Sequence, residues 1–347
     1  MPNAHIAIAR SKILQQIRNF FTEQKFIEVE TPILTPIPGM EPHLTPFETY
    51  LTIPSHISKT TTQQNIKNSK IIPGETSIPL YLNTSPELQM KKLLGSGFTN
   101  IFQLTKTFRN TEIGGPLHNP EFTMLEWYRT KADYKDLMRD CENLLISIIK
   151  NLKNTTSINF KTPWPRKSVN QLFIEHCKID LLKNKTFTQF KKAAKKLNYD
   201  TNACKTWDDI FFKLFLNYSE PNLPKNRPIF IYDYPASQAA LAKLNHKQPF
   251  FAERFELYIN KIEIANAFSE LTDAKEQQKR LKEEQLLRKK LKKTIFPIDE
   301  EFLASLESIS YPCAGIALGV DRLIMLLLNK ESIEETLLFP MIKMLKA

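Results

Sequence analysis

Glycine is scarce in this sequence, which contains only eight glycines among 347 residues. None of them forms the phosphate-binding pattern GxxxxGK[ST], and no clear GxGxxG pattern occurs. In P-loop and Rossmann proteins these patterns place main-chain N–H groups around the phosphates of a nucleotide. The sequence therefore argues against a nucleotide site of either type.

Cysteine and long apolar runs are also scarce. The four cysteines are widely spaced, without a CxxC pair or a Cys/His cluster of zinc-finger spacing, which fits a reducing compartment. The longest apolar run extends only from Leu323 to Leu328, whereas a helix needs about 20 apolar residues to cross a bilayer. The N-terminus has no basic segment followed by an apolar one. We therefore expect a cytoplasmic protein without a membrane segment.

The composition is that of a folded, basic protein, with 42% hydrophobic and 24% charged residues and a net charge of +11. Such a charge raises the local concentration of polyanions such as ATP, RNA or an acidic protein. The alternative is that the charge belongs to solvated Lys-rich helices such as KKAAKKL and KRLKEEQLLRKKLKK. Composition does not choose between these two interpretations.

The N-terminal third alternates between helical and strand-like patterns. Apolar residues recur at helical spacing from Ile6 to Phe21, which predicts an amphipathic helix that ends near Gln24. A strand-like run follows, FIEVETPIL, which Pro32 interrupts. Residues 51–80 are rich in Thr, Ser, Asn and Lys and indicate a polar loop or a long hairpin tip.

Two strand-like runs, 101–109 and 121–129, are separated by TEIGGPLHNP and predict a hairpin with a long turn. Residues 131–228 have a Lys-rich helical pattern, and we interpret them as a helical insertion. Strand patterns return at PIFIYDYP and RFELYINKIEIANAF. A capped charged helix then begins near Asp273, and a final strand turns at Gly319 into an apolar helix. Hairpins mixed with helices predict a single α+β domain over 1–347 rather than a doubly wound sheet.

Arg109 stands at the end of a predicted strand, next to the glycine-containing loop. On the second strand, alternation places Phe122, Met124, Glu126 and Tyr128 on one face. A guanidinium beside two aromatic rings and a carboxylate suits a ligand that carries an anion and a base. A solvated hairpin tip above a core face with a satisfied Glu is the plainer alternative.

Two further groups have the chemistry of a phosphate site. Glu263 and Glu270 are seven residues apart, so an unbroken strand would place them on opposite faces, and only a bend would let both approach Mg²⁺. Arg322 falls in the first turn of the helix after Gly319, where its charge adds to that of the helix N-terminus. A surface ion pair remains the alternative for the two carboxylates.

Three segments in this order resemble the class II aminoacyl-tRNA synthetases: FIEVETPIL, FRNTEIGGPLHNPEFTMLEWY and GIALGVDRLIML. Over nearly the whole chain the sequence is most similar to the lysyl-tRNA synthetase group. Within it, NTSPELQMKKLL, YPASQAAL and ERFELY are most like the stand-alone paralogues that ligate lysine to elongation factor P. The resemblance implies an antiparallel sheet flanked by helices and a homodimer through the Pro32 segment.

The resemblance also implies a role for particular residues. Arg109 would hold the α-phosphate of ATP and Arg322 the γ-phosphate, which makes these two arginines the expected catalytic residues. Glu263 and Glu270 would bind Mg²⁺. The expected ATP-binding residues are Arg109, Asn110, Thr111, Glu112, His118, Asn119, Phe122, Glu263, Ile264, Gly319 and Arg322. The residues expected around the amino acid are Ser85, Pro86, Glu87, Tyr128, Asn266, Glu270 and Ala317.

The sequence departs from the pattern of its relatives in two respects. The loop after Arg109 is one residue longer, with Thr111 where a Glu is usual, and Ala267 replaces the glycine of an Asn-Gly-Phe motif. Ala317 replaces a glycine of the synthetases, as it does in the ligases, which favours β-lysine. We also expect no anticodon-binding domain, because the first helix begins almost at Met1.

The sequence as a whole predicts ATP-dependent activation of (R)-β-lysine or lysine as an adenylate, followed by transfer to a lysine of elongation factor P. The site is expected to act by positioning and charge neutralisation. Two alternatives stay open: amino-acid activation with tRNA or a small amine as acceptor, and a non-catalytic paralogue that binds nucleic acid. We regard tRNA as the less favoured acceptor.

Overall fold

Helix α1 (Ala4–Glu23) opens the part of the chain that the computed structural model describes, residues 3–54, 70–72, 75–152 and 156–346. The side chain of Asn3 caps it by accepting hydrogen bonds from the N–H groups of His5 and Ile6. The predicted helix up to Gln24 is confirmed. Its buried face consists of Ile13, Ile17, Phe20 and Phe21.

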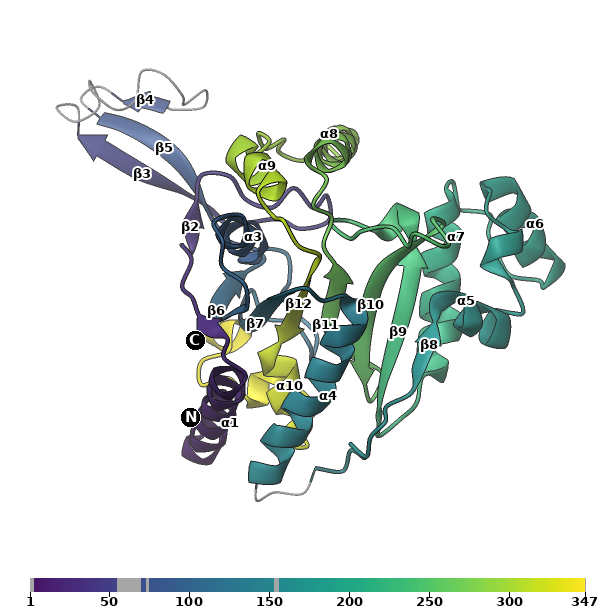
Figure 1. Cartoon of the computed structure of the whole chain (residues 1–347), viewed down its shortest axis with the longest axis horizontal. Helices are drawn as coiled ribbons and strands as arrows, with labels where there is room; N and C mark the ends of the chain where they lie inside the picture. Colours follow the sequence, from purple (N-terminus) through teal and green to yellow (C-terminus); the bar gives the residue numbers. More distant parts are fainter. Residues whose placement is uncertain (1–2, 55–69, 73–74, 153–155, 347) are drawn as a thin grey trace.

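A mixed sheet forms the centre of the molecule (Figure 1). Among the described residues it has eight strands in the order β1-β6-β7-β12-β11-β10-β9-β8. The pairs β1–β6 and β8–β9 are parallel and the others antiparallel. The α+β fold class is therefore confirmed. The strands are β1 (Ile27–Glu28), β6 (Ile101–Phe108), β7 (Glu121–Thr130), β8 (Arg166–Ser168), β9 (Pro228–Pro235), β10 (Phe251–Ile259), β11 (Ile262–Ser269) and β12 (Cys313–Gly319).

The main hydrophobic core lies on one face of this sheet. Helices α1, α4 (Tyr134–Asn151) and α10 (Val320–Leu327) cover that face (Figure 1). From the sheet, the buried side chains of Leu125, Trp127 and Ile316 pack into the same cluster. Because strand side chains alternate, their neighbours in sequence point to the opposite face. That opposite face is free to carry a site.

A second, smaller sheet projects from the main body (Figure 1). Strand β5 (Glu75–Leu82) pairs antiparallel with β3 (Glu48–Pro54), β2 (Leu34–Thr35) and β4 (Lys70–Ile72). The interpretation of 51–80 as a polar loop or hairpin tip agrees with this pairing, although 55–69 and 73–74 lie outside the described residues.

Helices α3 (Glu87–Gly95), α8 (Ala274–Lys290) and α9 (Glu300–Glu307) gather beside this hairpin (Figure 1). Leu281 of α8 and Phe302 of α9 pack with Met40 and Tyr81 in a separate small cluster. The chain from β2 to β3 is therefore held between the sheet and α8. The chain ends with a 3₁₀ turn, Ile333–Glu335, and α11 (Met341–Met344).

The segment 131–228, interpreted as an insertion, divides between two cores. Helix α4 belongs to the main core, whereas the cluster around Phe173, Phe190 and Phe211 packs on the outer strands β9 and β10. The extent of the insertion stays a prediction. Its helical part comprises α5 (Val169–Leu172), a π-helical turn (Phe173–Cys177), 3₁₀ turns (Leu181–Lys183, Glu220–Asn222), α6 (Phe187–Lys196), α7 (Trp207–Leu214) and a second π-helical turn (Phe215–Ser219).

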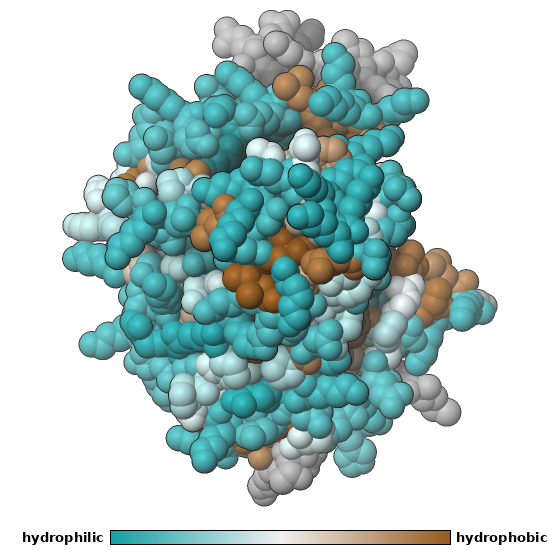
Figure 2. Space-filling model, turned by 90° about the vertical axis from the view of Figure 1, so that its right-hand side faces the viewer, coloured by the Kyte–Doolittle hydropathy of each residue, from teal (hydrophilic) through white to brown (hydrophobic). Residues whose placement is uncertain are grey.

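The surface on this side of the molecule is mostly hydrophilic, with a hydrophobic patch near its centre (Figure 2). The helical part exposes several large apolar side chains, including Ile174, Phe212 and Leu216. The four cysteines are all free and buried. No helix in the described ranges combines the length and apolar character needed to cross a membrane.

Candidate active site

One row of directly opposed residues crosses the sheet on the face away from the main core. Strand pairing places Glu126 of β7 between Gln103 and Ala317, and Ala317 opposite Asn266 of β11. Asn266 in turn lies opposite Glu256 of β10. The even-numbered face predicted for β7 is therefore confirmed, because Leu125 and Trp127 lie in the main core. The row places polar side chains from four of its five strands close together, with Ala317 of β12 among them.

A β-bulge brings Glu263 onto this face. Leu257 pairs with Ala265 but the next residue, Tyr258, pairs with Glu263, so Ile264 is an extra residue in β11. An extra residue reverses the alternation beyond it, so Glu263 shares a face with Asn266. The sequence predicted that the chain must bend for Glu263 to share a face with Glu270, and the bulge supplies that bend.

Beside this row lies a cleft of about 820 Å³, including its open mouth. It brings together most of the residues that were expected to bind ATP, from the loop between β6 and β7 and from β7, β11, β12 and α10. Asn110 and Thr111 do not line it. The lining residues are Arg109, Glu112, Leu117, His118, Asn119, Phe122, Met124, Glu263, Ile264, Ala265, Asn266, Ala317, Gly319, Asp321, Arg322 and Ile333.

Arg109 occupies one end of the cleft, directly after β6. Its Cζ lies 5.2 Å from the centre of the Phe122 ring, a cation–π contact. One guanidinium nitrogen donates to Glu112 at 3.0 Å, and Nε donates to the carbonyl of Thr84 at 3.4 Å. These contacts hold the guanidinium in place while it stays partly exposed to the cleft.

Arg322 reaches the same cleft from the first turn of α10. It donates to the carbonyls of Leu117 at 3.2 Å and Glu263 at 3.0 Å. Its Nη2 also lies 3.0 Å from Nε2 of His118. Burial, followed by the nearby Arg322 charge, lowers the pKa of His118, so a neutral imidazole faces the guanidinium. Two cations from separate segments thus face one cleft.

A second set of predicted residues forms a hydrogen-bonded group next to the cleft. The Ser85 hydroxyl donates to Oε1 of Glu126 at 2.7 Å, and the Tyr128 hydroxyl donates to Oε2 at 3.0 Å. The N–H of Glu87 donates to Ser85 Oγ at 3.0 Å. Burial raises the pKa of Glu126 to about 8, with a further contribution from Glu87. Of the predicted residues, Ser85, Glu87 and Tyr128 therefore converge here.

Lys91 joins this group and was missed from the sequence. Its side chain is 1% exposed, and Nζ lies 2.6 Å from Glu87 and 2.5 Å from Glu270. It also lies 5.1 Å from the centre of the Phe268 ring. Burial opposes its charge, but Glu270 and Glu87 together raise its pKa. The local sequence MKKLL does not show which of its two lysines is buried.

Glu256 and Arg254 were also missed. Arg254 donates to Asn266 at 2.9 Å and to Glu256 at 2.7 Å. Burial raises the pKa of Glu263 to about 7, and the charge of Glu256 contributes next. Glu263 therefore neighbours Glu256, whereas Glu270 faces Lys91. In the described ranges no group of three or more His, Cys, Asp or Glu side chains has the geometry of a metal site.

Comparison with known proteins identifies the family of the whole chain. The model of the family "tRNA synthetases class II (D, K and N)" matches residues 3–343. The elongation factor P–(R)-β-lysine ligase of Hamiltonella defensa is 38% identical over 343 residues, which cover 98% of this chain and 96% of that protein. The ligase of Histophilus somni is 40% identical over 340 residues (97% and 96%). That of Salmonella typhi is 39% identical over 343 residues (97% and 96%).

Proposed function

The chain belongs to the class II tRNA synthetases of the D, K and N type, and we propose that it is an ATP-dependent ligase that activates (R)-β-lysine or lysine and transfers it to elongation factor P. The observation that carries this proposal is the convergence of Arg109 and Arg322 on one cleft. Relatives of 38–40% identity over nearly the whole chain are ligases for elongation factor P.

In the first step, the carboxylate of the amino acid attacks the α-phosphorus of ATP and pyrophosphate leaves. Arg109 would neutralise charge on the α-phosphate, and Arg322 would hold the γ-phosphate. The contact between Phe122 and Arg109 supports a base stacked on the exposed side of that ring. His118 and Glu112 also line this cleft and would contact the adenine.

The amino acid would lie on the sheet face between Ser85 and Glu270. Glu87, Glu126 and Glu270 offer carboxylate oxygens for ammonium groups, and the Tyr128 hydroxyl lies among them. Ala317 and Asn266, which lie opposite each other in the sheet, would form the floor between this group and the phosphates. In the second step, the amine of an acceptor lysine attacks the activated carbonyl carbon and AMP leaves.

A divalent cation fits Glu256 and Glu263 better than the predicted pair Glu263 and Glu270. The first two carboxylates are neighbours and repel each other, which contributes to the raised pKa of Glu263. Oxygen ligands of this kind suit Mg²⁺. The carboxylate of Glu270 already faces the Lys91 ammonium. Bound Mg²⁺ would offset phosphate charge, and Glu256 and Glu263 would hold it.

We also place a second copy of the chain against the Pro32 segment, as the family resemblance implies. The apolar side chains of Ile27, Ile33 and Leu34 are 40–52% exposed beside it, and a homodimer would cover them. The free, buried cysteines support a cytoplasmic location. Sedimentation of the purified protein tests the dimer.

The function is tested by two measurements on the purified protein. ATP–pyrophosphate exchange with (R)-β-lysine and with lysine tests activation, and the mass gain of elongation factor P tests transfer. A parallel reaction with tRNA tests the alternative acceptor. Exchange together with a mass gain on the protein is the expected result. If the protein exchanges pyrophosphate and charges tRNA but does not modify elongation factor P, the proposed acceptor is wrong. If it does not exchange pyrophosphate at all, the proposal that it is an activating enzyme is wrong.

A further inference from the structure

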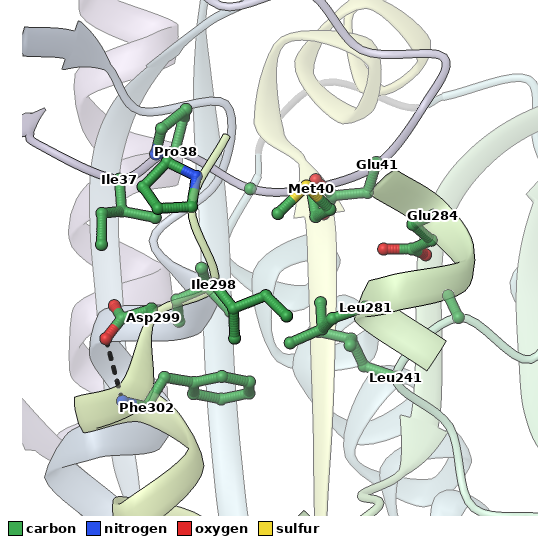
Figure 3. A pocket seen from close by; sticks show the side chains of 14 residues that line it. Ile37, Pro38, Met40, Glu41, Leu241, Leu281, Glu284, Ile298, Asp299 and Phe302 are labelled. Atoms are coloured by element: carbon green, nitrogen blue, oxygen red, sulfur yellow. Dashed lines mark hydrogen bonds between the residues drawn. The ribbon is translucent and has the colours of Figure 1, made fainter. Parts of the chain in front are cut away.

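Glu41 lies on the segment between β2 and β3, where two neighbouring cavities meet. One cavity is mostly apolar, and Figure 3 shows Glu41 and Glu284 at its edge, with Leu281, Ile298 and Phe302 among its apolar lining. The other cavity is lined by Ser85 and Glu87 of the proposed amino-acid site. Glu41 lines both cavities. Its carboxylate therefore separates an apolar space from the substrate side.

The fold does not use this carboxylate to hold the segment in place. Arg288 of α8 attaches the segment by donating to the main-chain carbonyl of Glu41 at 2.9 Å and to that of Leu44 at 3.4 Å. The Oε2 atom of Glu41 has no contact with solvent and no hydrogen-bond donor among the described residues. A buried carboxylate oxygen without a donor is costly. Its partner is therefore to be sought outside the chain.

Gly39 makes the space that this oxygen occupies. A Cβ atom at Gly39 would lie 2.2 Å from Oε2 of Glu41 and 3.1 Å from its Cδ. The φ angle of Gly39 lies outside the left-handed region, so the position needs a glycine for room and not for its backbone. Glycine at position 39 therefore allows the Glu41 side chain to take its observed position.

The charges that act on Glu41 come both from the proposed amino-acid site and from Arg109. Burial raises its pKa, Glu87 raises it further, and Arg109 and Lys91 oppose the rise. Glu270 is influenced by Lys91, Glu87 and Glu126 instead. The charge of Arg109, at the proposed α-phosphate position, therefore acts on the Glu41 carboxylate. The ammonium of Lys91 is already shared between Glu87 and Glu270, and no cation of the described residues lies within ion-pair distance of Glu41.

We propose that the Glu41 carboxylate binds the substrate ammonium group that lies nearer to the carboxylate of the substrate. Glu41 would thereby select a diamino acid. The inference rests on the proposed function, because Arg109 marks the position of the α-phosphate and hence of the reacting carboxylate. Glu270 and Tyr128, at the other end, take the distal ammonium. Glu41 acts as a specificity-determining residue and takes no part in proton transfer.

The test compares Glu41→Gln with Glu284→Gln in ATP–pyrophosphate exchange. Glu284 is the matched control, because it is a carboxylate of the apolar cavity that does not line the Ser85 cavity. We expect Glu41→Gln to raise the KM for (R)-β-lysine or lysine by about tenfold or more, since hydrogen bonds to charged groups contribute about 1.5–3 kcal/mol. The KM for ATP stays at its wild-type value. Glu284→Gln leaves both values unchanged.

A ligand with one amine identifies which ammonium is involved. 6-Aminohexanoate keeps the distal amine and lacks the other, so as a competitive inhibitor it should have the same Ki against wild type and Glu41→Gln. Gly39→Ala is a second variant that displaces the carboxylate without removing it, and it should reproduce the selective rise in KM. It also keeps the test available if Glu41→Gln does not fold.

The outcomes separate the inference from the function on which it rests. An unchanged KM for the diamino acid in both variants overturns the role of Glu41 while wild-type exchange still supports the enzyme. An equal rise in the KM for ATP, or an equal rise in the Ki of 6-aminohexanoate, also overturns it, because the effect is then not selective. No exchange by the wild type overturns the proposed function, and the inference with it.

Discussion

Arg322 Nη2 lies 3.0 Å from Nε2 of His118, and this contact joins the first turn of α10 to the loop between β6 and β7. The same guanidinium donates to the carbonyls of Leu117 and Glu263. One side chain thus ties together three segments that are far apart in sequence. A phosphate in the cleft would meet a guanidinium that is already oriented.

Arg322→Lys should therefore raise the KM for ATP by about tenfold or more. Lysine presents a single ammonium and cannot reach two carbonyls and a phosphate with the planar geometry of arginine. The measurement is ATP-dependent pyrophosphate exchange at saturating amino acid. Arg18→Lys is the control, because Arg18 forms a solvent-exposed pair with Glu28. An unchanged KM for ATP in Arg322→Lys would contradict the assignment to the γ-phosphate.

Arg109→Ala should abolish adenylate formation, with a loss of about three orders of magnitude in pyrophosphate exchange. The variant removes the charge next to Phe122 at the proposed α-phosphate position. Lys106→Ala is a suitable control on β6, the strand that directly precedes Arg109, because Lys106 pairs with Glu121 at the surface. Thermal unfolding checks that both variants are folded. If Arg109→Ala exchanged pyrophosphate at nearly the wild-type rate, its role at the reacting phosphate would be wrong.

The sequence predicted those parts of the fold that depend on local pattern. Strict alternation along β7 placed Phe122, Met124 and Glu126 on the site face, and the strand pairing agrees. The bulge at Ile264 could not be predicted, because an extra residue exists only relative to the partner strand β10. Local pattern thus identified the strand, whereas tertiary pairing decided which way Glu263 points.

The residues that sequence reasoning missed are those whose role depends on burial. Lys91 and Lys92 are adjacent in a helix, yet their side chains are 1% and 17% exposed. Glu256 became visible only through its position beside Asn266. The individual assignments to ATP and amino acid come from the family resemblance, and they stay predictions until the variants are measured.

The raised pKa of Glu126 predicts a pH dependence of stability. The unfolded chain loses this proton near the ordinary value of 4.5, whereas the folded chain holds it up to about 8. Between these values the folded state binds more protons, so the contribution of Glu126 makes the protein less stable as pH rises through this window. Glu126→Gln removes that contribution and keeps the shape of the side chain.

The check is the difference in unfolding temperature between Glu126→Gln and wild type at pH 5, 6, 7 and 8. We expect the unfolding temperature of Glu126→Gln to increase relative to that of the wild type as pH rises. Glu284, whose pKa is raised to about 8 by burial, is present in both proteins and contributes a slope to each. A constant difference across this range would show that Glu126 is already ionised at low pH.

Lys91→Met should destabilise the fold by about 3–5 kcal/mol, because it leaves Glu87 and Glu270 buried without their shared cation. Adding Glu270→Gln should recover part of the loss, since one unpaired charge is then removed. Lys92→Met is the control, because Lys92 pairs with the exposed Glu301 and with Asp299; we expect a loss of about 1 kcal/mol or less. Urea unfolding measures all three, and equal losses for the two lysines would contradict the buried pairing.

Gly315 and Gly319 both lie in β12. Replacing each of them with alanine gives a matched pair of variants that tests the amino-acid site. A Cβ at Gly315 would lie 2.2 Å from Cε1 of Tyr128 and 2.4 Å from Oε1 of Glu270. A Cβ at Gly319 would meet its nearest neighbours, in Arg322 and Ile264, at an ordinary 3.8 Å. The first glycine is therefore required for space, and the second is not.

Gly315→Ala should accordingly displace the Tyr128 ring and the Glu270 carboxylate, and raise the KM for the amino acid by about tenfold or more, as expected when a charged hydrogen bond is lost. Gly319→Ala should keep the KM values for both substrates within about threefold of wild type. Pyrophosphate exchange with varied amino acid and varied ATP separates the two effects. If Gly315→Ala impaired ATP and left the amino acid unaffected, the distal ammonium would have to bind elsewhere than beside Tyr128 and Glu270.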